Sequence, residues 1–589
     1  MKVINRILVF LMLFCLYNCT GVTDVQDSMN LDFEFKNPGS HLPKHWYTGG
    51  ESFKISVDSL EKHSGKFSLK METPGTRNNN SFGVFTGTLP IETFAGKNVE
   101  YRGWIKTKNV KNGYAGLWLR VDGENTETLG FDNMNDRGLT GDNDWTQVSI
   151  KIDISREAIN INYGGLFPGE GVVWFDNLEL YVNGEKFIEP KLKTTLSRKE
   201  KKVIKEYIYP LRTYEPDSGN TKDLEILEKL IGNSKVVALG EVSHGSSEIF
   251  KMKNRIIQYL AANSGFDIFS IEANMPESYK LNDYTVHGKG DPKKLIAGMY
   301  FWTWRTVEVL NMVEWMRRFN HPEKRIEFTG FDMQFYEGAV KELMDAFEED
   351  EIVRNKIADL GKILNEIKSR TQQNRELVSA DDNEMKEIDS LISFIQNSIE
   401  TSSFQTSDKQ WLQQNMVIIR QYLGSINYAW RDKCMADNVM WIKENNPDSK
   451  LVIWAHNGHI QKTSKMMGYH LARQLDDDYI TFGFTFYDGS FTAVGNKGLT
   501  FYEASRVYPG TLEYLLDKLN EPVFILDLKK IRSDNKKDTE WLLERLAYRS
   551  VGALGGSQYE FQNRIVSDDF DYLIFIRTST PSLLFPDTR

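Results

Sequence analysis

Two patterns of apolar and polar residues divide the chain, one that predicts strands alone and one that predicts strands alternating with helices. From about residue 29 to 184, short alternating runs are separated by turns rich in Gly, Asn and Asp. Regularly spaced strands of this kind are typical of an antiparallel, jelly-roll-like β-sandwich. The runs are SFKISVD, KFSLKME, VEYRGWIKTK, AGLWLRVD, WTQVSIKIDI and VVWFDNLELYV.

After a basic and polar linker at 185–200, the pattern changes to short apolar strands that alternate with amphipathic helices. Continuous apolar strands are typical of a largely parallel sheet covered on both faces, which predicts an α/β domain over 201–589. Between about 338 and 446 no strand is predicted, and charged heptad-like stretches indicate a helical insertion. The expected strands are 235–241, 266–273, 325–333, 450–457, 479–488, 523–528 and 571–578.

The sequence begins with a pattern that predicts an export signal. Lys2 and Arg6 precede the apolar run ILVFLMLFCLY, which is too short and too early for a stable membrane-spanning helix. The run ends in LYNC, which resembles the bacterial lipoprotein box and implies a lipid on Cys19. We therefore expect a signal peptide at 1–19, a tether at 20–28 and a lipoprotein anchored to a membrane of the cell envelope. Plain secretion, with Cys19 a chance cysteine, is the alternative.

Composition and charge narrow the range of partners. The 589 residues are enough for two or three compact units, and 72 Lys and Arg stand against 82 Asp and Glu, a net charge of −10. This balance gives no broad phosphate-binding surface, so nucleic acid is not an expected partner. Of the three cysteines, Cys15 would leave with the signal and Cys19 would carry lipid, which leaves Cys434 and no disulfide framework.

Titratable side chains follow several of the expected strands. In an open parallel sheet, ligands bind where the carboxyl ends of the strands leave the sheet. Three of the nine histidines fall at these ends, together with several carboxylates. Each alone is commonly a helix cap, a turn residue or a solvated strand end, but together they predict a site at one edge of the sheet. The residues are Glu241, His244, Glu272, Asp332, Gln334, His456, Asn457 and His459.

These side chains fit general acid–base chemistry on water. A neutral histidine between carboxylates is held in one tautomer and gains basicity, as a general base for water requires. Two histidines in H-x-x-H spacing supply donors that could polarise a carbonyl or hold an oxyanion. No G-x-S-x-G elbow occurs, and Cys434 lacks the local signature of a catalytic thiol, so direct attack by water is the simpler route. A zinc or manganese site is the competing interpretation, although HNGH does not match the helical H-E-x-x-H spacing.

Six blocks of sequence together resemble the erythromycin esterase family, in the family's order, over most of residues 225–580. The resemblance implies an α/β esterase without metal or cofactor that opens a macrolide lactone by hydrolysis. It implies His244 as the general base, with Glu241 and Glu272 orienting it or the water, while His456 and His459 would bind and polarise the ester. The blocks are GEVSHG, FKMKNR, SIEAN, FWTWRTVEVLNMVEWMRRFN, GFDMQ and WAHNGHI.

Further residues of the same blocks are expected around the substrate. Lys253 and Arg255 both stand where the family has a functional basic residue, and one sequence does not decide between them. Arg305 and Glu308 are charged residues within an apolar stretch, and they either reach the substrate or pair with each other. The other residues expected in the cleft are Asp332, Gln334 and Asn457.

The two ends of the predicted sandwich, NLDFEF and VWFDNLELYVNG, resemble jelly rolls of the carbohydrate-binding-module type. That resemblance implies a structural calcium held by Glu34 and Asp176, and a glycan as partner. Four tryptophans of this segment either stack on sugar rings or fill the core, namely Trp46, Trp104, Trp118 and Trp145.

The predicted function is hydrolysis of an ester or lactone, a macrolide or a related ester, by water that His244 activates. Two alternatives stay open: a non-catalytic glycan-binding surface lipoprotein, and a metal-dependent hydrolase of a carbohydrate-linked ester. The family's best-known resistance enzymes are single-unit cytoplasmic proteins. The export signal and the sandwich therefore leave the identity of the ester undecided.

Overall fold

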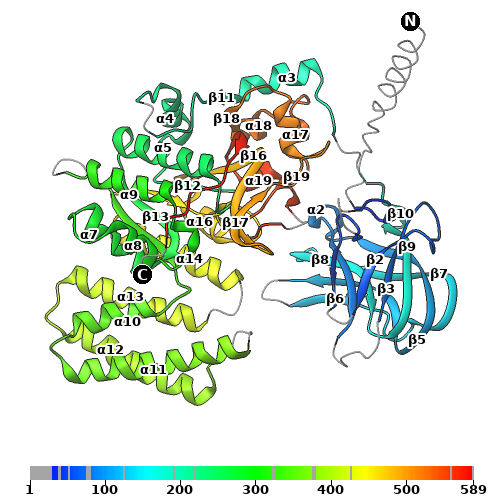
Figure 1. Ribbon diagram of the computed structural model, residues 1–589, viewed down its shortest axis with the longest axis horizontal. Coiled ribbons are helices and arrows are strands. Elements are labelled where there is room, and N and C mark those ends of the chain that lie inside the picture. Colours follow the sequence, from blue (N-terminus) through cyan, green and yellow to red (C-terminus); the bar gives the residue numbers. More distant parts are fainter. Residues whose placement is uncertain are drawn as a thin grey trace, which may run out of the picture. The chain divides into compact units, whose positions relative to one another are not determined.

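The computed structural model describes residues 29–36, 41–50, 53–73, 81–123, 127–189, 193–216, 219–321, 325–374, 380–424, 428–556 and 560–586. Contacts divide the chain between Thr194 and Thr195 into two compact units, coloured blue to cyan and teal to red in Figure 1. The expected signal peptide at 1–19, its Cys19 and the tether at 20–28 lie outside the described residues. Within the described ranges, no helix is both long and apolar enough to cross a bilayer.

The first unit is an antiparallel β-sandwich in which one long strand belongs to both sheets. β5 (Asn98–Asp122) pairs over its first half with β9 (Glu170–Val182) and over its second half with β8 (Asn160–Phe167). It also pairs with β7 (Leu139–Asp153) and with β6 (Thr128–Asp132). These antiparallel pairs confirm the predicted all-β sandwich. The remaining elements are β1 (Tyr47–Gly49), β2 (Lys54–Asp58), β3 (Ser68–Glu72), β4 (Gly83–Thr88), α2 (Ile91–Phe94) and β10 (Glu185–Lys186).

Buried aromatic residues fill the interior of the sandwich. Trp46 is fully buried, and its ring centroid lies 4.9 Å from that of Phe85 and 5.1 Å from that of Tyr163. Trp46 is therefore a core residue. Trp104, in contrast, is partly exposed, and its ring stacks on that of His63 with 4.1 Å between centroids.

The two carboxylates that we expected to share a calcium ion both hold the loop at 63–67. Asp176 accepts hydrogen bonds from two backbone N–H groups of this loop at 2.7 and 3.0 Å, and Glu34 accepts from two others at 2.6 and 3.0 Å. Calcium takes about six to eight oxygen ligands, so an ion here would have to displace these donors and recruit further oxygens. As described, the carboxylates anchor the loop, and the calcium stays a prediction.

Close approach of two strands makes one glycine of the sandwich a sensitive position. Gly164 of β8 pairs with Thr86 of β4, and a Cβ atom on it would lie 1.9 Å from the backbone oxygen of Phe85. We expect Gly164→Ala to lower the stability of the sandwich by about 2 kcal/mol, because the two backbones must separate. Calorimetry of the full chain should show an unfolding transition at lower temperature. Gly130→Ala is the matched control, since its nearest contact would be at 3.3 Å with a side chain, and equal shifts would contradict the prediction.

The second unit is built around a largely parallel sheet, as predicted. Its order is β11–β18–β21–β16–β12–β15–β13–β14. The pairs from β21 to β14 are parallel, whereas β18 and β11 add an antiparallel edge. The strands are β11 (Ile208–Pro210), β12 (Val236–Leu239), β13 (Phe266–Asn274), β14 (Glu327–Asp332), β15 (Lys450–Trp454), β16 (Tyr479–Gly495), β18 (Val523–Asp527) and β21 (Tyr572–Ser579).

Helices cover both faces of this sheet, because its central strand is apolar on both sides. Val236 and Ala238 of β12 face one hydrophobic core, and Val237 and Leu239 face another. α5 (Ser247–Asn263) and α9 (Val307–Phe319) pack on the second face. The other elements are α3 (Arg198–Ile204), α4 (Ile226–Ile231), α6 (Met275–Tyr279), α7 (Leu281–Thr285), α8 (Pro292–Gly298), α15 (Asn457–Ile460), α16 (Met467–Leu475), β17 (Gly498–Glu503), α17 (Leu512–Asp517), α18 (Leu528–Asp534), β19 (Leu546–Arg549), β20 (Phe561–Arg564) and α19 (Val566–Asp569).

The described residues between β14 and β15 form helices and no strand, in the stretch where the sequence predicts a helical insertion. Figure 1 shows the first four of these helices as a group in green to yellow. The fifth returns to the sheet, where Asn438 donates a hydrogen bond to the backbone oxygen of Phe331 in β14 at 2.9 Å. The helices are α10 (Glu337–Ala346), α11 (Glu351–Asn374), α12 (Asp382–Thr401), α13 (Thr406–Leu423) and α14 (Tyr428–Asn445).

Candidate active site

Four neighbouring strands bring their polar ends to one edge of the sheet. β12, β15, β13 and β14 are adjacent and parallel, so the residues that end or follow them lie side by side. α14 reaches the same edge and adds two charged residues. The side chains gathered there are Glu241, His244, Glu272, Asp332, Gln334, Arg431, Asp432, His456 and His459.

His244 and Glu241 form a hydrogen-bonded pair after β12. Nδ1 of His244 lies 2.7 Å from Oε1 of Glu241, which fixes Nδ1 as the protonated nitrogen and Nε2 as the basic one. Glu241 is fully buried, whereas 15% of the His244 side chain is exposed. Within the described ranges, Nε2 makes no hydrogen bond to the protein. This nitrogen is therefore available to a water molecule.

Three donors from three elements surround the Glu241 carboxylate. Besides His244, Nζ of Lys253 donates to Oε2 at 2.8 Å and Nε1 of Trp454 donates to the same oxygen at 2.6 Å. Burial alone would raise the pKa of Glu241, but the charge of Lys253 and the hydrogen bond from His244 lower it below its usual value. Glu241 is therefore a carboxylate at neutral pH.

Lys253 forms an ion pair with Glu241 and is not exposed to solvent. Its side chain is fully buried, and Nζ lies 4.1 Å from the centroid of the Trp454 ring. Burial lowers the pKa of Lys253 to about 8, although the charge of Glu241 acts in the opposite direction. Arg255, two residues further along α5, instead pairs with Asp223 at 2.6 Å and donates to two backbone oxygens. The structure thus places Lys253 in the cluster and Arg255 outside it.

His456 is held as a neutral ring. Its Nδ1 accepts a hydrogen bond from the backbone N–H of Gly458 at 3.1 Å, and its Nε2 donates to the backbone oxygen of Val242 at 3.3 Å. Burial, and then the charges of His244 and His459, lower the pKa of His456 to about 3. Because both ring nitrogens are engaged, the N–H reaches a substrate only by leaving Val242.

His459 is held as a cation. Nδ1 donates to Asp432 at 2.8 Å, and Nε2 lies 3.2 Å both from Oε1 of Glu272 and from NH1 of Arg431. Nε2 cannot donate to the carboxylate and accept from the guanidinium at the same time. Burial alone would lower the pKa of His459, but the negative charges of Glu272 and Asp432 raise it to about 10, which favours the protonated ring that donates to Glu272.

Arg431 joins the carboxylates at the ends of β13 and β14. Its NH2 lies 2.9 Å from Glu272 and 2.8 Å from Asp332, and Gln334 donates to Asp332 at 2.6 Å. Burial alone would raise the pKa of Glu272, but the charges of His459 and Arg431 hold it well below its usual range. The second half of the site is therefore a buried network of full charges.

Arg431, Asp432 and Trp454 contact the residues of the candidate site, which the sequence did not reveal. The first two stand in WRDKC near the start of α14, where adjacent charges look like the solvated face of a helix. Trp454 is the last apolar residue of β15, and its position directly before AHN was the only available signal. All three residues contact partners far away in the sequence, so no local pattern predicts these contacts.

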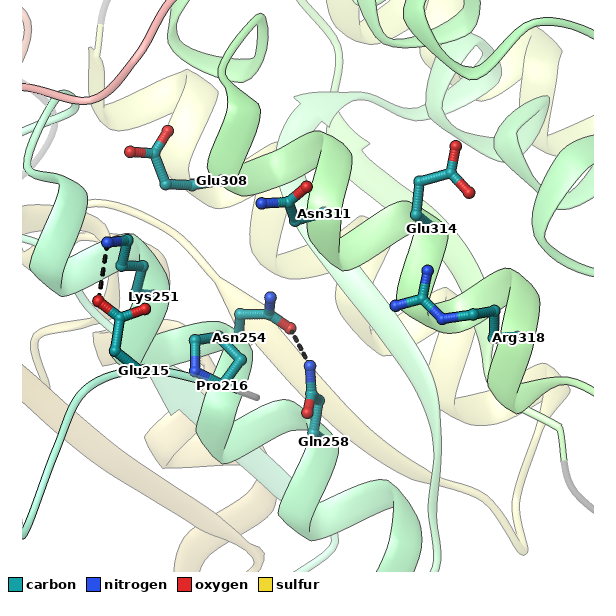
Figure 2. Close-up of a pocket in the computed structure, with 9 residues that line it drawn as sticks. All are labelled: Glu215, Pro216, Lys251, Asn254, Gln258, Glu308, Asn311, Glu314 and Arg318. Carbon is teal, nitrogen blue, oxygen red and sulfur yellow. Dashed lines mark hydrogen bonds and ion pairs between the residues drawn. The ribbon is translucent and has the colours of Figure 1, made fainter. Parts of the chain in front are cut away.

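Three other residues expected around the substrate lie elsewhere in the structure or have structural partners. Asn457 is fully buried, donates to the backbone oxygen of Phe484 at 2.7 Å and accepts from the N–H of the same residue at 3.1 Å. It therefore ties the loop after β15 to β16. Glu308 lines a groove between α5 and α9, shown in Figure 2, while the backbone oxygen of neighbouring Arg305 accepts from the N–H of Phe585 at 3.1 Å.

The structure also bears on two alternatives, a metal site and a catalytic Cys434. In the described part of the chain, no group of three or more His, Cys, Asp or Glu residues has an arrangement that could hold a metal ion. Cys434 of α14 is buried, and burial raises the pKa of its thiol to about 12. A thiol with so high a pKa is a poor nucleophile at neutral pH.

The fold and this site define an α/β enzyme with an acid–base pair at its strand ends. The family model for erythromycin esterase matches residues 261–579, more than half of the chain, and the chain belongs to this family. Glu241, His244 and Lys253 precede the matched range, and the other cluster residues lie within it.

Individual relatives agree with a hydrolase at the level of the family. The chain is 26% identical to erythromycin esterase type II of Escherichia coli over 332 residues, 49% of this chain and 78% of that protein. It is 23% identical over 424 residues to YbfO of Bacillus subtilis, which is named as a hydrolase, covering 65% of this chain and 91% of that protein. A solved structure named as a succinoglycan biosynthesis protein is similar with a TM-score of 0.56 and 26% identity, over 66% of this chain and 98% of that one.

The charged state of His459 predicts how stability changes with pH. Its pKa of about 10 in the folded chain, against 6.5 for an ordinary histidine, means that the folded state holds an extra proton between these values. That contribution is fully present below about pH 6.5 and is lost as the pH rises toward 10. We expect the free energy of unfolding to fall by about 1 kcal/mol more between pH 7 and 8 in the wild type than in His459→Gln.

Urea unfolding of the two proteins at pH 7 and pH 8 measures this difference. The depressed pKa of Lys253 contributes the opposite slope as the pH rises through about 8, but it does so in both proteins, so the difference between them reports His459. Parallel changes in the two proteins would show that His459 is not charged in the folded chain.

Proposed function

We propose that the protein hydrolyses a carboxylic ester or lactone by direct attack of a water molecule that His244 activates. The observation that carries the proposal is the 2.7 Å hydrogen bond from Nδ1 of His244 to the buried Glu241 carboxylate, which leaves Nε2 as the basic nitrogen of a partly exposed side chain. Membership of the erythromycin esterase family supports ester chemistry. A macrolide lactone is one member of this substrate class.

The proposed reaction begins with proton transfer from water to Nε2 of His244. As the water oxygen forms its bond to the carbonyl carbon, the C=O electron pair moves onto the carbonyl oxygen. Glu241 stabilises the imidazolium that forms, because its charge lies against Nδ1–H. When the tetrahedral intermediate collapses, the bond to the leaving oxygen breaks and His244 returns the proton to that oxygen, so acid, alcohol and the resting enzyme result.

The cations paired with Glu272, Asp332 and Asp432 supply the positive electrostatic field that stabilises the oxyanion. Arg431 and His459 carry positive charge in a largely buried setting, and 13% of the Arg431 side chain is exposed. Their positions are fixed by Glu272, Asp332 and Asp432, so little reorganisation accompanies the reaction. We assign His456 a smaller part, because its donor is engaged with Val242.

Removing the base tests the proposal directly. His244→Asn is expected to lower kcat about 10²- to 10⁴-fold, the usual contribution of a general base. The purified full chain is incubated with erythromycin and with acetylated sugars, and mass spectrometry follows the gain of one water. His287→Asn, the same change at an exposed histidine, is the control. Hydrolysis by His244→Asn at the wild-type rate, or no hydrolysis of any ester by the wild type, would contradict the proposal.

A double substitution separates catalysis by Glu241 from its effect on stability. Glu241→Gln leaves the buried charge of Lys253 without its partner, which should cost about 3–5 kcal/mol. Adding Lys253→Met removes that charge, so the double variant should regain much of the stability while its kcat stays low. Urea unfolding and the mass assay are run on the wild type, the single variant and the double variant. Recovery of activity together with stability would mean that Glu241 acts only through packing.

A further inference from the structure

A polar groove lies on a different face of α5 from the one that carries Lys253. It is lined by residues of α5 and α9 together with Glu215 and Pro216, and it encloses about 150 Å³. Figure 2 shows the two helices side by side, with Asn254 and Gln258 of one and Asn311 of the other lying toward the space between them, while Lys251 turns toward Glu215. The volume is smaller than that of pockets for drug-sized ligands, which begin at about 300 Å³, so the groove suits a single small molecule.

A largely buried asparagine lines this groove and has a donor without a protein partner. Asn254 is 2% exposed, and its Oδ1 accepts a hydrogen bond from Nε2 of Gln258 at 3.1 Å. Within the described ranges, Nδ2 of Asn254 makes no hydrogen bond. This nitrogen keeps contact with solvent in the groove, so a ligand oxygen that accepts from it would take the place of a water molecule.

The charged residues of the groove are largely engaged with the protein. Lys251 pairs with Glu215 at 2.9 Å, and Glu308 accepts from the hydroxyl of Ser247 and from a backbone N–H. The Tyr284 hydroxyl donates to Glu314 at 2.8 Å. The rim therefore carries three carboxylates and two cations, one of which is the exposed Arg318, while Asn254, Gln258 and Asn311 line the groove with amides. A ligand here is recognised by hydrogen bonds and not by its net charge.

We propose that this groove binds an uncharged polyhydroxy compound of the size of a monosaccharide. Hydroxyl groups both donate and accept, as the mixed amide lining requires. One ligand oxygen accepts from Nδ2 of Asn254, and neighbouring hydroxyls bond to Gln258 and to Asn311 of α9, which Figure 2 shows on the opposite wall. Pro216 gives the carbon face of a sugar ring an apolar surface. The site does not depend on the proposed esterase mechanism.

Saturation-transfer NMR with the full chain tests the site. The probes are D-glucose, D-xylose, N-acetyl-D-glucosamine and myo-inositol, with D-glucuronate and D-glucosamine as charged comparators. At least one neutral probe should bind, and more tightly than either charged comparator. Asn254→Leu, which keeps the shape but removes the donor, should weaken binding about tenfold or more.

Two further variants keep the test decisive. Asn311→Trp fills the groove from an exposed position, so its effect does not depend on disturbing the core. Asn263→Leu is the matched control on the same helix, because Nδ2 of Asn263 bonds to the backbone oxygen of Tyr259 and lies outside the groove. Loss of binding in Asn254→Leu and Asn311→Trp, with retention in Asn263→Leu, supports the site.

Three results would overturn it. They are no binding of any neutral probe, tighter binding of a charged comparator, and binding that survives both groove substitutions. The last result would place the sugar elsewhere on the chain, for example on the sandwich. Ester hydrolysis is measured on the same samples, so failure of this site is distinguished from failure of the proposed function.

Discussion

The buried carboxylate of Glu241 is the group on which the rest of the site depends. It receives hydrogen bonds from the loop after β12, from α5 and from the last residue of β15. A charge so deeply buried is stable only while all three donors stay in place, because desolvation of an ionised carboxylate is costly. The charge of this carboxylate therefore depends on the strand order and on the packing of α5. The carboxylate in turn fixes the tautomer of His244.

The ion-pair network at the ends of β13 and β14 likewise keeps buried charges stable by pairing them, and it contains more residues. Glu272, Asp332 and Asp432 form ion pairs with Arg431 and His459, and every one of these side chains is largely buried. Buried ion pairs add little net stability compared with apolar packing. What they provide is a fixed arrangement of charge, which is the property that an enzyme needs where charge develops during a reaction.

Sequence predicted the strand-end residues well, for a reason that lies in the fold. Parallel strands place their carboxyl ends at one edge, so Glu241, Glu272 and His456 had to be neighbours once the strands were recognised. Lys253 and Arg255 could not be separated, because both lie in a helix with apolar residues around them and only packing decides which face turns inward. Asn457 has the residue type of a substrate-binding group, and only the position of the Phe484 backbone shows that it is a tie.

The helical insertion shows a similar limit. Its extent was visible from the absence of strand patterns, whereas its return to the sheet through Asn438 was not. Arg431 reaches the site only because that return positions the start of α14 over the strand ends. A long-range contact made by one helix turn leaves no periodic signal in the sequence.

The long strand β5 also bears on how the first unit is made. Its 25 residues come before all four of the strands that pair with it, β6 to β9, which extend to Val182. During synthesis the apolar face of β5 therefore lacks part of its partner strands until about sixty more residues have emerged. Pairing between such distant residues is slow to form, and until it forms residues 98–122 are an exposed, aggregation-prone segment.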